Sequence, residues 1–88
     1  MAKHEYKYTL DFEESALSAL ETLPKDIRRQ IGYGIDLLQR DWTGDIKKLV
    51  GQKNEYRLKV GKFRVLFELE GQAINVYAVK DRKDAYGR

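Results

Sequence analysis

The sequence predicts an α+β fold with the element order β-α-α-β-β-β, in which a two-helix hairpin packs on one face of an antiparallel sheet. Apolar residues recur at helical spacing in the first half of the chain. Three strand-like runs, separated by glycine-containing turns, fill most of the second half. The 88 residues suffice for one small domain, residues 1–88, with one modest hydrophobic core.

The first strand and the first helix are expected near the N-terminus. Residues 6–10, with the sequence YKYTL, alternate in polarity and are rich in β-forming side chains, so they predict a strand. The first helix is expected over residues 11–23. Asp11 suits its N-cap, and Glu14 follows three residues later, which is the spacing of a capping box.

The second helix is expected over residues 24–40. Pro24 ends the first helix and suits the first turn of the second. The apolar residues of this segment share one stripe, which we expect to face the core: Ile27, Ile31, Ile35 and Leu38. Gly32 and Gly34 weaken the helix, and we expect them to allow close packing of the two helices.

Three strands in series are expected in the second half, at about residues 55–60, 62–69 and 72–79. Gly61 and Gly71 lie between them, at positions that suit tight hairpin turns. Successive strands that are joined by such short turns pair in antiparallel fashion, which predicts the sheet.

The turn at Gly61 determines which side chains share a face. A two-residue loop there places Lys59 directly opposite Arg64. Alternation then assigns ten residues to the core face: Tyr56, Leu58, Val60, Phe63, Val65, Phe67, Leu69, Ile74, Val76 and Ala78. The open face receives Arg57, Lys59, Arg64, Leu66, Glu68, Ala73, Asn75, Tyr77 and Val79, with Tyr77 opposite Arg64.

The composition argues against several classes of protein. The chain has no cysteine, so it has no disulfide framework and no thiolate nucleophile or metal site. No cluster of histidine and carboxylate residues occurs at ligand spacing, so we expect no metal and no other cofactor. No apolar run approaches the length of a membrane span, and the N-terminus lacks the apolar core of a signal peptide. We therefore expect a soluble, cytoplasmic protein.

Positive charge is concentrated in the second half of the chain. Residues 1–42 carry six Lys and Arg against eight Asp and Glu, a net charge of −2. Residues 43–88 carry eleven against six, a net charge of +5. Such asymmetry indicates a polyanion or an acidic protein as the partner.

The predicted open face carries like charges opposite each other, which weakens a sheet by roughly a few tenths of a kcal/mol per pair. We interpret Arg57, Lys59 and Arg64 as an anion site, most simply one for a phosphate backbone. Arg82 and Tyr86 join this site if the tail folds back along the sheet. The alternative is a solvated face on which lysine and arginine prevent aggregation through the sheet edges.

The segment KKLVGQKNEYRLKVGKFRVLFEL and the ending VYAVKDRKDAYGR, together with the element order, resemble the RelE/ParE superfamily of bacterial toxins. The resemblance covers essentially the whole chain and is most specific in these two segments. RelE-like members of the superfamily are endoribonucleases that cut mRNA on the ribosome. ParE-like members inhibit DNA gyrase and lack the residues for RNA cleavage. The match favours the RelE-like branch and its fold.

The resemblance implies a catalytic set, Lys59, Arg64, Arg82 and Tyr86, and a substrate-binding residue, Arg57. The predicted register adds Tyr77 of the open face as a substrate-binding residue. Other basic residues flank this site, namely Lys47, Lys48, Lys53 and Lys62, and we expect Lys53 and Lys62 to bind the substrate as well. Many relatives have a histidine where this chain has Asp81, and its only histidine, His4, lies outside the matching segments. Histidine acid–base chemistry is therefore not expected.

Two candidates for the general base remain. Lys59 lies between Arg57 and Arg64, and neighbouring positive charge favours the neutral amine that a base requires. Tyr86 is the alternative. Arg64 is expected to stabilise the charge of the transition state, and Arg82 to act as general acid or as a second phosphate clamp.

The resemblance further implies a toxin of a type II toxin–antitoxin system. Its partners are then the ribosome, mRNA and a cognate antitoxin, with no role for a membrane or a metal. A gyrase inhibitor of the same fold and a nucleic-acid-binding domain without chemistry are the alternatives.

Overall fold

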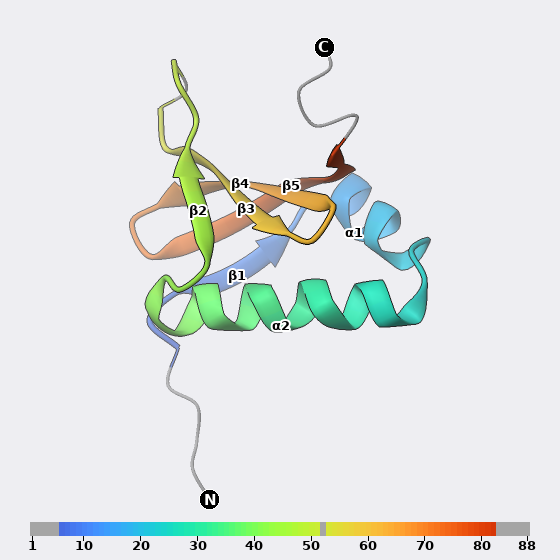
Figure 1. Ribbon diagram of the computed structural model, residues 1–88. Helices are drawn as coiled ribbons and strands as arrows, with labels where there is room; N and C mark the ends of the chain where they lie inside the picture. Colours follow the sequence, from blue (N-terminus) through green and yellow to red (C-terminus); the bar gives the residue numbers. More distant parts are fainter. Residues whose placement is uncertain (1–5, 52, 83–88) are drawn as a thin grey trace, which may run out of the picture.

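The computed structural model describes residues 6–51 and 53–82, which form a five-stranded sheet and two helices (Figure 1). In chain order the elements are β1 (Thr9–Phe12), α1 (Glu14–Glu21), α2 (Lys25–Asp41), β2 (Asp45–Lys48), β3 (Glu55–Val60), β4 (Phe63–Glu70) and β5 (Ala73–Asp81). The strand order is β1-β5-β4-β3-β2. The predicted α+β class and the helical hairpin are confirmed.

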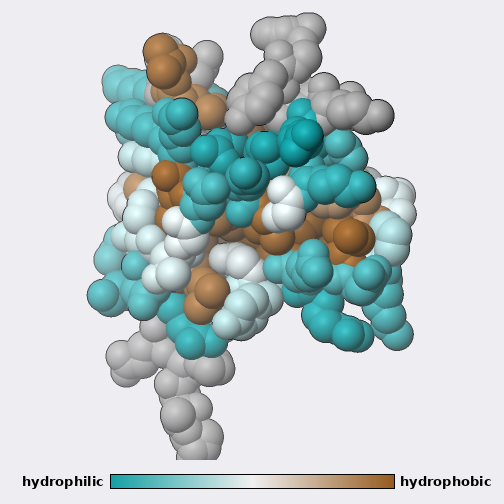
Figure 2. All heavy atoms as spheres, in the orientation of Figure 1, coloured by the Kyte–Doolittle hydropathy of each residue, from teal (hydrophilic) through white to brown (hydrophobic). Residues whose placement is uncertain are grey.

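The hydrophobic core lies between α2 and one face of the sheet. Figure 1 shows α2 running along that face, and Figure 2 shows hydrophobic side chains in a band between helix and sheet. The predicted stripe of α2 supplies the buried residues Ile31, Ile35 and Leu38, while Ile27 is half-buried. The sheet supplies Leu58, Val65, Phe67, Ile74 and Val76. α1 packs against β5 and buries Ala16.

The β3–β4 hairpin has the predicted register. Val60 lies opposite Phe63, and Lys59 lies opposite Arg64. Gly61 adopts φ +59°, a conformation that glycine reaches without the steric cost that a β-carbon imposes. Because this turn fixes the alternation of both strands, Arg57, Lys59 and Arg64 lie on the face away from α2.

The sheet differs from the prediction at both of its edges. β2 was not predicted, and it pairs antiparallel with β3, with Asp45 opposite Lys59 and Lys47 opposite Arg57. β1 pairs in parallel with β5, so the sheet is mixed and not wholly antiparallel. Parallel pairing follows from topology, because the chain crosses over through two helices and three strands before β5 returns beside β1.

The β4–β5 pairing also differs from the prediction. Glu70 pairs with Ala73, so the connecting loop comprises Gly71 and Gln72. A bulge beside Leu66 then inserts Tyr77 as an extra residue in β5. The prediction that Tyr77 lies opposite Arg64 was therefore wrong.

The same bulge reverses the facing of the residues that follow it. Val79 packs against the core and does not join the open face. Ala78 pairs with Leu66, an open-face residue, so it does not join the core face as predicted.

The start of the helical hairpin lies later in the chain than predicted. Asp11 belongs to β1, and α1 begins at Glu14 with Glu13 as its N-cap and no side-chain capping bond. Pro24 is the N-cap of α2. Gly34 faces β3 and not α1: a β-carbon there would lie 3.0 Å from Cγ2 of Val60. The glycine thus lets α2 approach the sheet.

Candidate functional site

Positively charged residues form rows across the face of the sheet that α2 leaves uncovered. Lys59 of β3, Arg64 of β4 and Lys80 of β5 are consecutive register partners. Next to this row, Lys47 of β2 lies opposite Arg57 of β3. These five residues are called the cationic face below. Figure 2 shows hydrophilic side chains gathered over this side of the molecule.

Two arginines of the cationic face are buried. Arg57 exposes 8% of its surface and reaches Asp45 of β2, with 3.8 Å between Nη2 and Oδ1. Arg64 exposes 6%, and its Nη1 donates a hydrogen bond to the Phe63 carbonyl at 3.3 Å. The Nε of Arg64 is buried without a hydrogen-bond partner among the described residues.

A buried guanidinium nitrogen without a hydrogen-bond partner destabilises the fold unless an anion accepts its hydrogen bond. Lys59 and Lys80 on either side add to that cost, because like charges opposite each other destabilise a sheet. Protection of sheet edges does not explain the row, since β3 and β4 are interior strands. The arrangement is suited to binding a negatively charged group at Arg64.

The other predicted site residues are divided between the two ends of β3. Lys62 is exposed in the β3–β4 turn, and its carbonyl accepts a hydrogen bond from the backbone N–H of Arg82 at 2.6 Å. Arg82 is thereby held at the same end of the sheet as Lys59. Lys53 is exposed in the β2–β3 connection, at the opposite end of β3. Tyr86 and His4 lie outside the described residues.

Tyr77 is half-buried and interacts with carboxylates, not with the cationic row. Its hydroxyl donates a hydrogen bond to Oε1 of Glu55 at 2.7 Å. Burial and this hydrogen bond raise the pKa of Tyr77 above its ordinary value, and the charge of Glu68 adds to the effect. The hydroxyl therefore stays protonated near neutral pH, and the ring is held in one place by Glu55.

Two members of the cationic face were missed as site residues by the sequence reasoning. Lys80 follows the last predicted strand, residues 72–79, and no pattern in the β5 sequence indicates the bulge that brings it opposite Arg64. Lys47 was regarded only as a flanking residue, because β2 has one apolar residue, Ile46, in the sequence DIKK. Gly44 before that segment and Gly51 after it were the available signals for a short strand.

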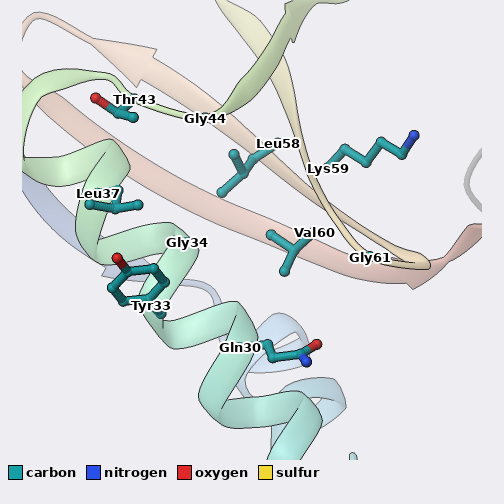
Figure 3. A pocket seen from close by; sticks show the side chains of 10 residues that line it. All are labelled: Gln30, Tyr33, Gly34, Leu37, Thr43, Gly44, Leu58, Lys59, Val60 and Gly61. Atoms are coloured by element: carbon teal, nitrogen blue, oxygen red, sulfur yellow. The ribbon is translucent and has the colours of Figure 1, made fainter.

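The opposite side of β3 lines a groove against α2, with a volume of about 440 Å³. Figure 3 shows Leu58 and Val60 pointing toward the helix, while Lys59 points away from it. This alternation separates an apolar side of the strand from the cationic face.

Neither a metal centre nor a membrane span is found in the described part of the chain. No three His, Cys, Asp or Glu side chains of residues 6–51 and 53–82 are grouped so that they could hold a metal ion. Neither described helix is long and apolar enough to cross a membrane.

The fold and the cationic face define a small basic α+β protein with positive charge gathered on one face of its sheet. Its sequence is 34% identical over 80 residues to Toxin RelE3 of Methanocaldococcus jannaschii, an alignment that covers 85% of this chain and 91% of the relative. The chain therefore belongs to the RelE toxin family of toxin–antitoxin systems. No protein-family model matches the sequence.

Solved structures agree with this assignment. The RelB–RelE antitoxin–toxin complex from Methanococcus jannaschii matches with a TM-score of 0.74 and 31% identity, over 86% of this chain and 94% of that one. The archaeal RelE–RelB complex from Pyrococcus horikoshii matches with a TM-score of 0.75 and 25% identity, over 90% and 99% of the two chains. A mutant of the E. coli toxin RelE in the free state shares the fold, with a TM-score of 0.77 at 22% identity over 90% and 87%.

Proposed function

We propose that this RelE toxin is an mRNA interferase, an endoribonuclease that cleaves translated mRNA on the ribosome and so inhibits translation. The observation that carries the proposal is the buried Arg64, whose Nε has no partner among the described residues and whose neighbours across the sheet are Lys59 and Lys80. Such a site attracts a phosphate and is organised before the phosphate arrives.

The proposed chemistry is attack by the ribose 2′-OH on the adjacent phosphate. The 2′ oxygen forms a bond to phosphorus while the bond to the 5′ oxygen of the next nucleotide breaks. The products are a 2′,3′-cyclic phosphate and a new 5′-OH end. The 2′-OH loses its proton to a general base, and the leaving 5′ oxygen gains one from a general acid.

Lys59 is our first choice for the general base, and Tyr86 is the alternative. Lys59 is exposed and has Arg64 opposite it on β4, with Arg57 two residues earlier on the same face. Its amine is therefore next to the guanidinium groups that would hold the phosphate. Asp45 lies opposite Lys59 on β2, and its carboxylate is paired with Arg57.

The remaining cations stabilise charge and hold the substrate. Arg64 is held in place by its burial, which suits it to stabilise the charge that develops on the phosphate. Arg57 holds the RNA backbone. Lys80 and Arg82 lie on the far side of Arg64 from Lys59, where one of them donates the proton to the leaving oxygen.

The ribosome contributes to the proposed reaction by positioning the mRNA. No histidine or paired carboxylate takes part, so positioning of the mRNA in line for attack must supply several kcal/mol of the rate enhancement. Lys53 and Lys62, exposed at the two ends of β3, are placed to contact ribosomal RNA phosphates. Each would contribute salt-dependent affinity and no sequence preference.

We also propose a cognate antitoxin as the partner that silences the toxin in the cytoplasm, where translation occurs. Two similar structures are complexes of RelE with RelB, one from Methanococcus jannaschii and one from Pyrococcus horikoshii. A partner with acidic side chains would complement the cationic face.

Primer extension on an mRNA that is being translated in a purified system tests the activity. The wild type should produce new 5′ ends inside codons, only when ribosomes are present. Arg64→Ala should abolish them. Arg29→Ala, which removes an exposed arginine from α2 on the opposite side of the sheet, should preserve them.

Three other results would overturn the proposal. Growth arrest without cleavage would point to inhibition of DNA gyrase. Salt-dependent RNA binding without cleavage or growth arrest would leave a nucleic-acid-binding domain. Cleavage of free RNA at the same sites without ribosomes would contradict the dependence on the ribosome.

A further inference from the structure

A cavity of about 440 Å³ lies between α1 and β5 and has no role in the mechanism above. Ser15 and Ala19 of α1 line one side of it. Leu66 of β4 lies on another side, together with Tyr77 and Lys80 of β5. β1 pairs with β5 only as far as Val76, so the part of β5 beyond that point faces α1 instead of a strand.

The cavity borders the cationic face. Lys80 belongs to both, and it lies directly opposite Arg64. Leu66 is two residues beyond Arg64 on the same face of β4, a spacing of roughly 6.6 Å along a strand. That spacing is comparable with the reach from a phosphate to the base of the same nucleotide. Leu66 is also the register partner of Arg57.

The lining suits a flat heterocycle with polar edges. Small side chains at Ser15, Ala19 and Ala78 create the space, and Leu66 gives it an apolar wall. The ring of Tyr77 adds an aromatic surface, and its hydrogen bond to Glu55 fixes the position of that ring. The Ser15 hydroxyl and the Lys80 ammonium are polar groups that can meet the edge of a base.

We propose that this cavity holds the nucleobase of a nucleotide whose phosphate is bound by Arg64 and Lys80. The inference rests on the proposed function, since it assigns a base-binding subsite to the same RNA-cleaving surface. Tyr77 is then a substrate-binding residue through its ring and not through a charge contact with the phosphate. A base that is held here fixes the phosphate next to it, so the cavity also contributes to the choice of cleavage position.

An NMR titration tests the subsite without requiring catalysis. The ¹⁵N-labelled wild type is titrated with the four nucleoside 5′-monophosphates and, separately, with ribose 5-phosphate. All ligands should shift the amide signals of Arg64 and Lys80. Nucleotides should also shift those of Ala19, Leu66 and Ala78 and bind about tenfold more tightly, the factor that stacking on an aromatic ring provides. Equal affinity and equal shifts for ribose 5-phosphate would overturn the proposal.

A matched pair of variants on α1 provides the control. Ser15→Leu fills the cavity, whereas Ser18→Leu makes the same change at an exposed position of α1 that does not line it. Ser15→Leu should reduce nucleotide affinity to that of ribose 5-phosphate, and Ser18→Leu should leave it unchanged. Equal affinity in both variants would overturn the subsite.

The same pair separates this proposal from the proposed function. In the translation assay, Ser15→Leu should flatten the base preference next to the cleaved bond while cutting continues. A preference that Ser15→Leu leaves unchanged contradicts the subsite alone. If the wild type binds nucleotides through the cavity but never cuts, the ribonuclease proposal fails and the subsite stands.

Discussion

Arg64 and Lys80 lie directly opposite each other on β4 and β5, and one extra residue in β5 puts them there. Without Tyr77 as the bulge residue, Val79 would lie opposite Arg64, and Lys80 would point toward the core side. The bulge therefore completes the row that begins with Lys59, and it also brings Tyr77 to the cavity beside α1.

Arg64→Ala should reduce ribosome-dependent cleavage by about 10² to 10³, the effect of removing one charge-stabilising donor. Its thermal stability should not fall, because the change removes a buried charge whose Nε has no described hydrogen-bond partner. Cleavage kinetics and thermal unfolding of the same preparation check both parts. Lost activity accompanied by a large loss of stability would mean that Arg64 is structural.

Lys80→Ala should lower the cleavage rate by about tenfold, which corresponds to about 1.4 kcal/mol of transition-state stabilisation. Lys80→Arg should keep most of the rate, because a guanidinium also carries the charge to the phosphate. Lys25→Ala, at the exposed start of α2, is the matched control. The same rate in Lys80→Ala and in this control would remove Lys80 from the site.

Tyr77→Phe should destabilise the fold at pH 7 by about 1 kcal/mol, the net value of the hydrogen bond to Glu55. Because the folded-state pKa of Tyr77 is raised above its ordinary value of 10.0, this contribution is fully present below pH 10 and is lost as the pH rises through the folded-state value. Urea unfolding at a series of pH values should show the difference between the two proteins narrowing only above pH 10. A constant difference would contradict the assignment.

Gly32→Ala and Gly34→Ala should have different effects, because the two positions are two residues apart and face different sides of α2. A β-carbon at Gly32 meets nothing within 4 Å, so alanine should stabilise the helix by about 0.5–1 kcal/mol. A β-carbon at Gly34 lies 3.0 Å from Cγ2 of Val60, so that gain should be lost or reversed. Denaturant unfolding of both variants checks this, and equal stabilisation would show that α2 moves away from β3 freely.

The central hairpin could be predicted from the sequence because one local signal sufficed. A two-residue loop at Gly61 sets the pairing of β3 and β4, and alternation then places Arg57, Lys59 and Arg64 on one face. The apolar stripe of α2 is equally local. Both predictions depend on the periodicity of apolar residues within one segment, and that periodicity can be read from the sequence alone.

The remaining features depend on contacts between distant segments. β2 has a single apolar residue, so its composition does not indicate a strand. It becomes a strand because it pairs with β3. Asp11 has the spacing of a helix cap, but its pairing with Asn75 draws it into β1. The bulge at Tyr77 arises where β5 leaves β1 and meets α1, so no pattern within β5 could predict the place of Lys80.

The parallel pairing of β1 with β5 has a consequence for the toxin's own synthesis. Thr9 pairs with Ala73, so β1, the first of the described strands, has no partner strand until β5, the last of them, has been synthesised. Such distant pairing also makes folding slower than in a protein held together by local contacts. A chain whose translation stops before Ala73 carries Lys59 and Arg64 but lacks Lys80 and the partner of β1. Such a truncated chain would therefore lack both the complete sheet and the complete cationic face.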